Sequence, residues 1–274
     1  MRLLKQWFSF YVFSNVHVAI AAYCLTKITF LEFGFQNEYL ALFVFFSTIL
    51  SYNLIRLFQL DKINSMTAIW IRANKKGLLV LNILALSGIV YFAFKLSIRG
   101  LLALLPFFIA TVFYVLPIKN KAIGLRQVPA LKLILIAFSW VGITLYFPLQ
   151  EVGHLDVSNQ WLYFVQRLLF IIAITIPFDI RDAQFDLPEL ATLPQVFGVN
   201  KAKIVAVICM VLFILLSVFL KGKQSTFFYA DLILMFISIG LILYCNQNRN
   251  RFYTTFWIEA LPILWYLLYL VLID

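Results

Sequence analysis

Residues Leu168 to Asp186 read LLFIIAITIPFDIRDAQFD, so that a long apolar run ends in three carboxylates in a chain with only 12 acidic residues. The apolar part is typical of a membrane-spanning helix. Asp179, Asp182 and Asp186 stand at i, i+3 and i+7, which a helix of about 100° per residue brings within an arc of about 60°. Carboxylates on one face repel one another unless a cation lies across them. The pattern therefore predicts a functional site at the water-facing end of a membrane helix.

The chain as a whole resembles this apolar run in composition. All 274 residues together are 64% hydrophobic and 12% charged, with a mean hydropathy of +0.96, which excludes an ordinary soluble domain. We therefore predict an all-α polytopic membrane protein with a single domain over residues 1–274. About nine spans are expected, or eight if the two runs flanking Lys95–Gly100 form one helix. The expected spans are 7–29, 37–58, 77–95, 100–118, 129–148, 160–178, 202–220, 227–245 and 253–273.

The basic residues orient these spans. If the N-terminus is cytoplasmic, most of the 22 lysine and arginine residues fall on the cytoplasmic side. The positive-inside rule thus predicts the N-terminus inside, the C-terminus outside and a multi-pass protein of the plasma membrane. The net charge of +10 reflects this topology and attraction to the inner leaflet of the lipid bilayer, so we expect no nucleic-acid partner. The outer loops are expected to carry only scattered charges, among them Glu32 and Lys221.

Under this topology the polar residues gather at the cytoplasmic face. The second span ends in the polar stretch 51–61, the fourth in Tyr114 to Lys119 and the sixth in the aspartate cluster. Carboxylate oxygens are ligands that Mg²⁺ prefers, and Mg²⁺ keeps positions open for substrate phosphates. The sequence therefore predicts a site for a magnesium-bound phosphate or diphosphate that faces the cytoplasm.

Several of these stretches resemble the UbiA superfamily of intramembrane prenyltransferases. Asp179-x-x-Asp182-x-x-x-Asp186 is similar to the second aspartate motif of menaquinone-type and archaeal-lipid-type members, and Thr192-Leu-Pro…Gly198 to the stretch that follows it. Tyr114-Val-Leu-Pro-Ile-Lys119 resembles the family's Tyr…Lys motif, and Gly124-Leu-Arg-Gln-Val-Pro…Lys132 the beginning of its fifth helix. Nine helices with the same orientation are also implied.

The first aspartate motif of that family is incomplete in this chain. The family pattern is Asn-Asp-x-x-Asp-x-x-x-Asp; placing its Asn on Asn53 puts Leu54, Leu57 and Asp61 at the three acidic positions. Two of three acids are therefore missing. Arg56 offers a permanent charge nearby, and one hypothesis is that it binds the diphosphate directly in place of a metal ion. The alternative is an arginine that reaches the headgroups of the inner leaflet.

The resemblance implies transfer of a prenyl group from an isoprenoid diphosphate to a lipophilic acceptor, such as an aromatic compound or a quinone precursor, with Mg²⁺ as cofactor. It implies catalytic roles for Asp179, Asp182 and Asp186, and metal binding by Asp182, Asp186 and Asp61. The residues expected at the diphosphate are Asn53, Arg56, Tyr114 and Lys119.

Two alternatives to the enzyme stay open. One is a non-catalytic protein that binds an isoprenoid diphosphate or a quinone, and the other is an ion-coupled transporter. The sequence also contains polar residues within its spans, namely Asn15, His17, Arg167 and Glu259. Such residues usually face the bundle interior. His17 is expected to be a hydrogen-bonded packing residue, and Arg167 and Glu259 are not expected to pair with each other.

Overall fold

The computed structural model describes residues 2–59, 66–115, 131–153, 159–184 and 191–273, and these residues are helical with no strand. The elements are α1 (Arg2–Phe13), α2 (Val16–Phe33), α3 (Glu38–Gln59), α4 (Met66–Ala73), α5 (Lys75–Ala93), α6 (Ile98–Ala103), α7 (Leu105–Val115), α8 (Leu131–Val141), η3 (Gly142–Tyr146), α9 (Phe147–Val152), α10 (Gln160–Asp182), α11 (Leu193–Phe197), α12 (Val199–Lys221), α13 (Thr226–Tyr244), η5 (Tyr253–Ile258) and α14 (Leu261–Ile273).

Within the described residues, 8 helices are long and apolar enough to cross a membrane. They are Val16–Phe33, Glu38–Leu57, Lys75–Ala93, Leu131–Val152, Gln160–Asp182, Val199–Lys221, Thr226–Tyr244 and Tyr253–Leu272. A shorter apolar segment, Ile98–Thr111, occupies the position of the fourth expected span. The chain is a multi-pass α-helical membrane protein, as the composition predicted. Nine crossings, with this short segment as the ninth, remain a prediction.

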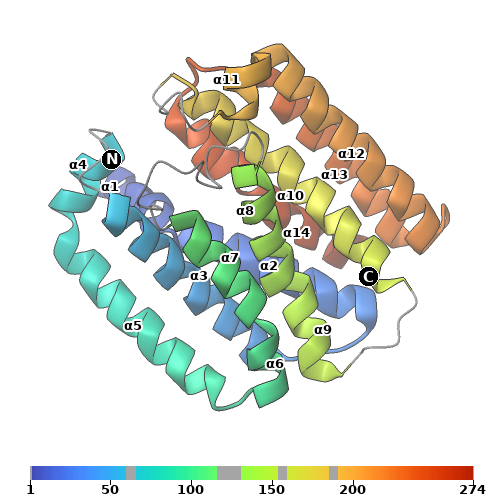
Figure 1. The fold of residues 1–274 in the computed structure, drawn as a ribbon, viewed down its shortest axis with the longest axis horizontal. Helices are drawn as coiled ribbons and strands as arrows, with labels where there is room; N and C mark the ends of the chain where they lie inside the picture. The colour runs from blue at the N-terminus through green and yellow to red at the C-terminus, as the bar shows by residue number, and fades with distance from the viewer. Residues whose placement is uncertain (1, 60–65, 116–130, 154–158, 185–190, 274) are drawn as a thin grey trace.

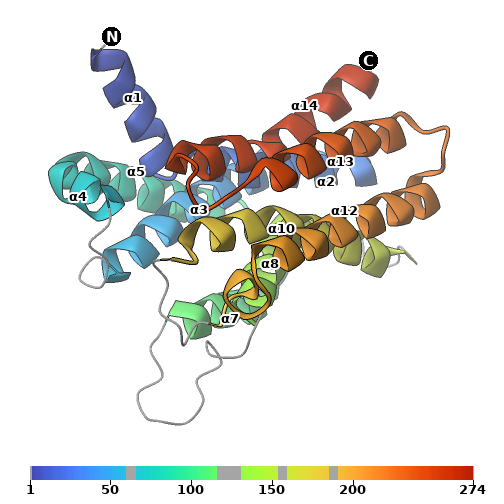
Figure 2. The ribbon, with the colours of Figure 1, turned by 90° about the horizontal axis from the view of Figure 1, so that it is seen from above.

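The helices form one bundle (Figure 1). Seen from above, α13 and α14 lie on one side of α10 and α12, and α7 and α8 lie on the other (Figure 2). The beginning of α1 and the end of α14 lie at opposite ends of the long helices in both views. An odd number of crossings requires this arrangement; which end faces the cytoplasm remains a prediction.

Large apolar side chains cover the outside of the bundle. Phe219, Phe236 and Val271 are 70%, 65% and 73% exposed. Water would make such a surface prone to aggregation, whereas lipid tails solvate it. The interior is packed around Phe170, Phe213, Trp265 and Tyr269, whose rings contact one another in pairs between α10, α12 and α14.

The first expected span, 7–29, is interrupted, so that prediction was wrong at its beginning. α1 ends at Phe13, and the spanning helix α2 begins at Val16. Asn15 has a φ of 68°, in the left-handed region that asparagine tolerates better than most residues. Its side-chain amide donates to Oδ1 of Asn53, 2.7 Å away on α3. This hydrogen bond fixes the break between α1 and α2.

Two spans contain π-helical turns, each followed by a proline. η3 precedes Pro148 and η5 precedes Pro262. A proline has no N–H to donate to the carbonyl four residues earlier, and its ring crowds that carbonyl, so the helix widens locally. Thr144 is four residues before Pro148, and its carbonyl instead accepts a 2.7 Å hydrogen bond from the hydroxyl of Thr29. The wide turn therefore also joins this span to α2.

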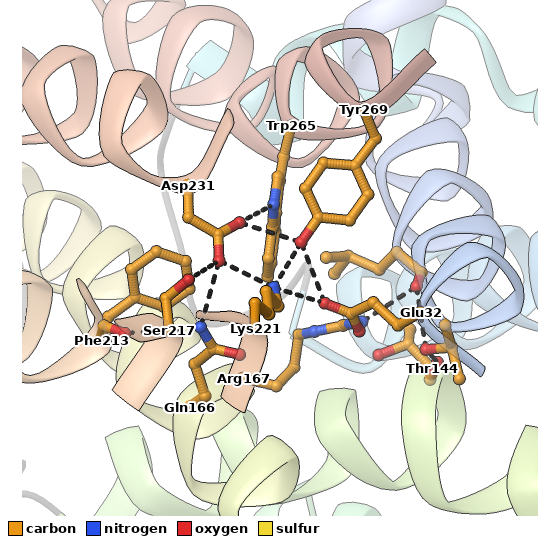
Figure 3. A network of polar contacts seen from close by, with 12 residues as sticks. Glu32, Thr144, Gln166, Arg167, Phe213, Ser217, Lys221, Asp231, Trp265 and Tyr269 are labelled. Atoms are coloured by element: carbon orange, nitrogen blue, oxygen red, sulfur yellow. Dashed lines mark hydrogen bonds and ion pairs between the residues drawn. The ribbon is translucent and has the colours of Figure 1, made fainter. Parts of the chain in front are cut away.

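A buried network of charges joins five helices near the end of the bundle where α14 ends (Figure 3). Glu32 of α2 accepts from Arg167 of α10 at 3.0 Å and from Lys221 of α12 at 2.8 Å. Asp231 of α13 accepts from Lys221 at 2.7 Å. The side chains of all four residues are at most 3% exposed. Two anions and two cations balance, which lets the charges stay buried.

Neutral side chains complete this network. Trp265 and Tyr269 of α14 donate to Oδ1 of Asp231 at 2.8 and 2.9 Å, and Ser217 donates to Oδ2. The prediction that Glu32 and Lys221 are scattered loop charges was therefore wrong, since both lie within helices and are buried. Arg167, which had no obvious partner in the sequence, binds a residue 135 positions away.

Candidate functional site

A cavity of about 360 Å³ opens at the other end of the bundle, between α2, α3, α7, α8, α10 and the last span. This volume lies within the range of about 300–1,000 Å³ usual for small-molecule sites. Its polar lining includes Tyr52, Arg56, Lys132, Asp179, Arg181, Asp182 and Glu259. Its apolar lining includes Val18, Ile136, Ile143, Ile171 and Ile174. A larger hollow of about 870 Å³ between α1 and α4 has no acidic residue in its lining.

The aspartates of α10 reach this cavity because the helix continues past Pro177 to Asp182. Asp179 is buried, and its Oδ1 lies 3.0 Å from Nζ of Lys132, in the first turn of α8. The ammonium group compensates the carboxylate, which would otherwise be costly to bury. The cation predicted across the aspartates was Mg²⁺, and that remains a prediction; the structure places the ammonium group of Lys132 beside Asp179.

Asp182 is paired with its own neighbour in the sequence. Nε and Nη2 of Arg181 lie 2.8 and 2.6 Å from the two carboxylate oxygens, in the bidentate geometry that guanidinium favours. The remaining Nη1 of Arg181 donates to the hydroxyl of Thr254 at 2.6 Å, which links α10 to η5. The guanidinium lies 5.2 Å from the ring centre of Phe178. Arg181 is thus held by three contacts at the cavity wall.

The side of the cavity formed by α3 carries no acid among its described residues. Ser51, Tyr52, Ile55 and Arg56 line the cavity, and Leu54 and Leu57 are each 41% exposed and do not. Two of the three positions aligned with acids of the first aspartate motif therefore do not line the cavity, and the third, Asp61, lies outside the described residues. Nη1 of Arg56 donates to the carbonyl of Phe13 at 2.9 Å.

Asn53 lies outside the cavity lining. It accepts a hydrogen bond from Asn15 and donates one of 2.8 Å to Oδ1 of Asn82 on α5. These contacts join α3 to its two neighbours in the bundle. The expected role of Asn53 at the diphosphate remains a prediction, and the structure gives it a packing role.

Four predicted site residues cannot be placed. Asp61, Lys119 and Asp186 lie outside the described residues, as does the side chain of Tyr114. The roles of these four residues therefore remain predictions. In the part of the chain that the structure describes, no three His, Cys, Asp or Glu side chains are grouped to hold a metal ion.

The donor set nevertheless fits the predicted Mg²⁺. This ion commonly binds through one or two carboxylates and completes its shell with substrate phosphates and water. Asp179 and Asp182 line one cavity, and among the described residues nothing bonds to Oδ2 of Asp179. A third protein carboxylate is not required when the ion arrives with a diphosphate.

Sequence reasoning gave no role to three residues of the cavity. Lys132 and Arg181 were noticed only as parts of motifs, although each is the cation that pairs with an aspartate. Glu259 was noticed only as an acid within a span. A charged residue next to or within an apolar run was the only sign in the sequence that these residues matter. The partner of each one depends on tertiary packing. His17 is hydrogen-bonded on both ring nitrogens, as expected of a packing residue.

Comparison with known proteins finds similarity at the level of structure. No protein-family model matches the sequence, and no curated protein matches it. The apo structure of a UbiA homolog from Aeropyrum pernix K1 matches with a TM-score of 0.65, over 95% of this chain and 96% of that chain, at 13% sequence identity. At this identity the match shows the fold, and it agrees with the resemblance carried by the motifs. The chain therefore has a UbiA-like fold.

Proposed function

We propose that this protein is an intramembrane prenyltransferase, which transfers the prenyl group of an isoprenoid diphosphate to a lipophilic acceptor. The observation that carries this proposal is the cavity itself. It combines carboxylates and cations at the ends of α3, α8 and α10 with apolar walls that continue between the helices. A long apolar chain with a charged head needs both surfaces in one site.

The polar end of the cavity binds the diphosphate. Lys132, Arg56 and Arg181 supply positive charge, and the negative charge on the leaving group grows as the carbon–oxygen bond breaks. Cations fixed in advance around that charge lower the barrier. Asp179 and Asp182 are the residues that would hold Mg²⁺, and the ion would supply further neutralisation of the leaving group's charge.

The aromatic and apolar walls act on the prenyl group. Tyr52 and Trp140 line the cavity, and Nε1 of Trp140 donates to the Tyr52 hydroxyl at 2.8 Å, which fixes both rings. Aromatic faces stabilise the allylic cation, and exclusion of water prevents its capture. Ile171, Ile174 and Ile143 accommodate the chain of the donor.

The reaction takes place at the cytoplasmic face of the plasma membrane, because the basic residues orient the bundle with this end of α3 and α10 inside. The acceptor enters from the lipid bilayer. No nucleic acid takes part.

The decisive experiment incubates membranes containing the protein with radiolabelled prenyl diphosphates of several lengths and a lipid extract, with and without Mg²⁺. A magnesium-dependent labelled lipid product that is absent from membranes carrying Asp182→Asn supports the enzyme. Saturable diphosphate binding without any product would instead identify a non-catalytic binding protein. Absence of both binding and product would reject the proposal.

A further inference from the structure

Glu259 occupies a fixed position in the last span. It follows the wide turn η5 and precedes Pro262, and it lines the cavity together with Thr255. The turn is fastened to α2, because Nε2 of His17 donates to the carbonyl of Phe256 at 3.0 Å. That donation requires the proton on Nε2, so Nδ1 accepts from the hydroxyl of Tyr11 at 2.6 Å. π-helical turns often mark functional sites, and this one places a carboxylate inside the bundle.

Glu259 differs from the other acids of the cavity in having no partner among the described residues. Asp179 and Asp182 each accept a hydrogen bond from a cation. Across the described residues, no donor forms a hydrogen bond or ion pair with the Glu259 carboxylate. The charges of Arg56 and Arg181 act on it from further away.

The two arginines whose charges act on Glu259 form their hydrogen bonds with other residues. Those of Arg181 reach Asp182 and Thr254, and Nη1 of Arg56 reaches the carbonyl of Phe13. Glu259 is half-buried where it lines the cavity, and a carboxylate within a membrane protein without a donor is costly. The cavity therefore provides an acceptor of hydrogen bonds that a ligand with an O–H group would satisfy.

We propose that Glu259 binds the O–H group of the prenyl acceptor and takes its proton during transfer. The inference rests on the proposed function and adds the residue that acts on the acceptor. Arg181 separates the two halves of the site, since it contacts Asp182 on the diphosphate side and Thr254 in the same segment as Glu259. The leaving group and the departing proton are thus assigned to different helices.

The step balances without a further reactant. The bond between the first prenyl carbon and the diphosphate oxygen breaks, and its electron pair leaves with the diphosphate. The acceptor supplies the electron pair of the new bond, from its hydroxyl oxygen or from a ring carbon conjugated with it. The O–H bond breaks with its electrons kept by the acceptor, and the proton passes to the Glu259 carboxylate, which becomes neutral. General-base assistance of this kind contributes about 10²–10⁴-fold in rate.

Ligand binding tests the inference independently of turnover. Isothermal titration calorimetry of the purified full-length protein in detergent micelles compares 4-hexylphenol with 4-hexylanisole, which has the same ring and hexyl chain but a methyl ether in place of the O–H donor. The wild type is expected to bind the phenol at least tenfold more tightly, and Glu259→Leu is expected to lose this preference. No preference in the wild type, or an unchanged preference in Glu259→Leu, would overturn the inference.

Glu259→Gln separates binding from proton transfer. The amide keeps an oxygen that accepts a hydrogen bond but cannot take the proton, so it should retain most of the preference for the phenol and lose transfer at least 100-fold. Glu259→Asp should recover part of the transfer, and affinity for a non-hydrolysable prenyl diphosphonate should stay within twofold in both variants. Wild-type transfer by Glu259→Gln, or loss of diphosphonate binding, would contradict the assignment. If the wild type binds no diphosphonate, the proposed function fails, and the phenol preference still decides the role of Glu259.

Discussion

Lys132 in the first turn of α8 lies 3.0 Å from the buried carboxylate of Asp179 on α10, 47 positions later in the chain. The lysine side chain is 18% exposed and faces the cavity, whereas the aspartate side chain is 5% exposed. Both residues line the cavity, and the ammonium group is the more exposed of the two. An incoming diphosphate can therefore share the ammonium group while Oδ2 of Asp179, which accepts no hydrogen bond among the described residues, stays available to a metal ion.

Substitution of Lys132 tests this arrangement. Lys132→Met is expected to weaken binding of a non-hydrolysable prenyl diphosphonate at least tenfold, because it removes a positive charge beside the leaving group and leaves Asp179 unpaired. Scintillation-proximity binding with labelled diphosphonate measures the loss.

Lys203→Met is the matched control. Lys203 of α12 donates to the carbonyl of Leu243 and does not line the cavity. Its replacement should change the affinity less than twofold. Equal effects of the two substitutions would indicate a general effect of surface charge and contradict a specific role for Lys132.

Asp182→Asn should abolish transfer while the protein still folds. The Asp182 side chain is 30% exposed, so its ion pair with Arg181 contributes about 1 kcal/mol or less to stability. Loss of a ligand to the magnesium-bound diphosphate should lower transfer by about 10²–10³-fold, the magnitude typical of one lost transition-state contact. Product formation and the melting temperature in detergent are measured together. A variant with wild-type turnover would rule out Asp182 as a ligand.

Arg56 lines the cavity, whereas Leu54 and Leu57 at the acidic positions of the incomplete motif do not. Arg56→Gln should weaken diphosphonate binding at least tenfold, because the neutral amide removes a charge from the cavity lining. Unchanged affinity would instead favour an arginine that serves only to hold the carbonyl of Phe13.

A second pair of substitutions on α3 tests which positions a metal ligand could use. Ile55 lines the cavity and Leu57 does not. Ile55→Asp, combined with Arg56→Gln, should restore diphosphonate binding only when Mg²⁺ is present. Leu57→Asp in the same background should restore nothing. Rescue by Leu57→Asp would support the motif alignment made from sequence and contradict the face assigned by the structure.

Much of the fold follows from the sequence, because hydropathy alone determines where a chain can cross a membrane. A span over 160–178 with the aspartates at its end was predictable for this reason, and α10 continues to Asp182. The interruption at Asn15 was not predictable, since it depends on a left-handed residue and on a hydrogen bond to Asn53. Periodicity carries no information about such a contact.

The candidate site was predictable only in part. Asp179 and Asp182 stand out as acids at the end of an apolar run. Their partners differ, however, because Lys132 pairs across two helices and Arg181 pairs with the adjacent residue. That Glu259 has no donor among the described residues depends on the positions of its neighbours in the fold. Pairing depends on tertiary packing, which one sequence does not reveal.

Topology is tested by reporter fusions at described loop positions. Fusions after Gly153 and Gly222 should report the outside and a fusion after Asn248 the cytoplasm, because the basic residues are concentrated on the latter side. A fusion at Asp274 should also report the outside. Gly222 and Asn248 on the same side would contradict the orientation of α13 and the cytoplasmic placement of the site.

The buried network is expected to stabilise the fold and not to act in transfer. Glu32→Gln removes one of two anions that balance Arg167 and Lys221, whose side chains are 2% and 3% exposed. Breaking a buried pair in this way costs about 3–5 kcal/mol. Glu38→Gln is the matched control, because Glu38 also pairs with a lysine, Lys27, but its side chain is 50% exposed and the pair is worth about 1 kcal/mol or less.

Both variants are compared by fluorescence-detected thermal unfolding in detergent. Glu32→Gln should unfold at a clearly lower temperature than the wild type, and Glu38→Gln within about a degree or two of it. Affinity for the prenyl diphosphonate, measured below the unfolding temperature, should match the wild type in both, because the network and the cavity lie at opposite ends of α10. Weakened diphosphonate binding by folded Glu32→Gln would show that the two ends of the bundle are coupled, and would contradict a purely structural role for the network.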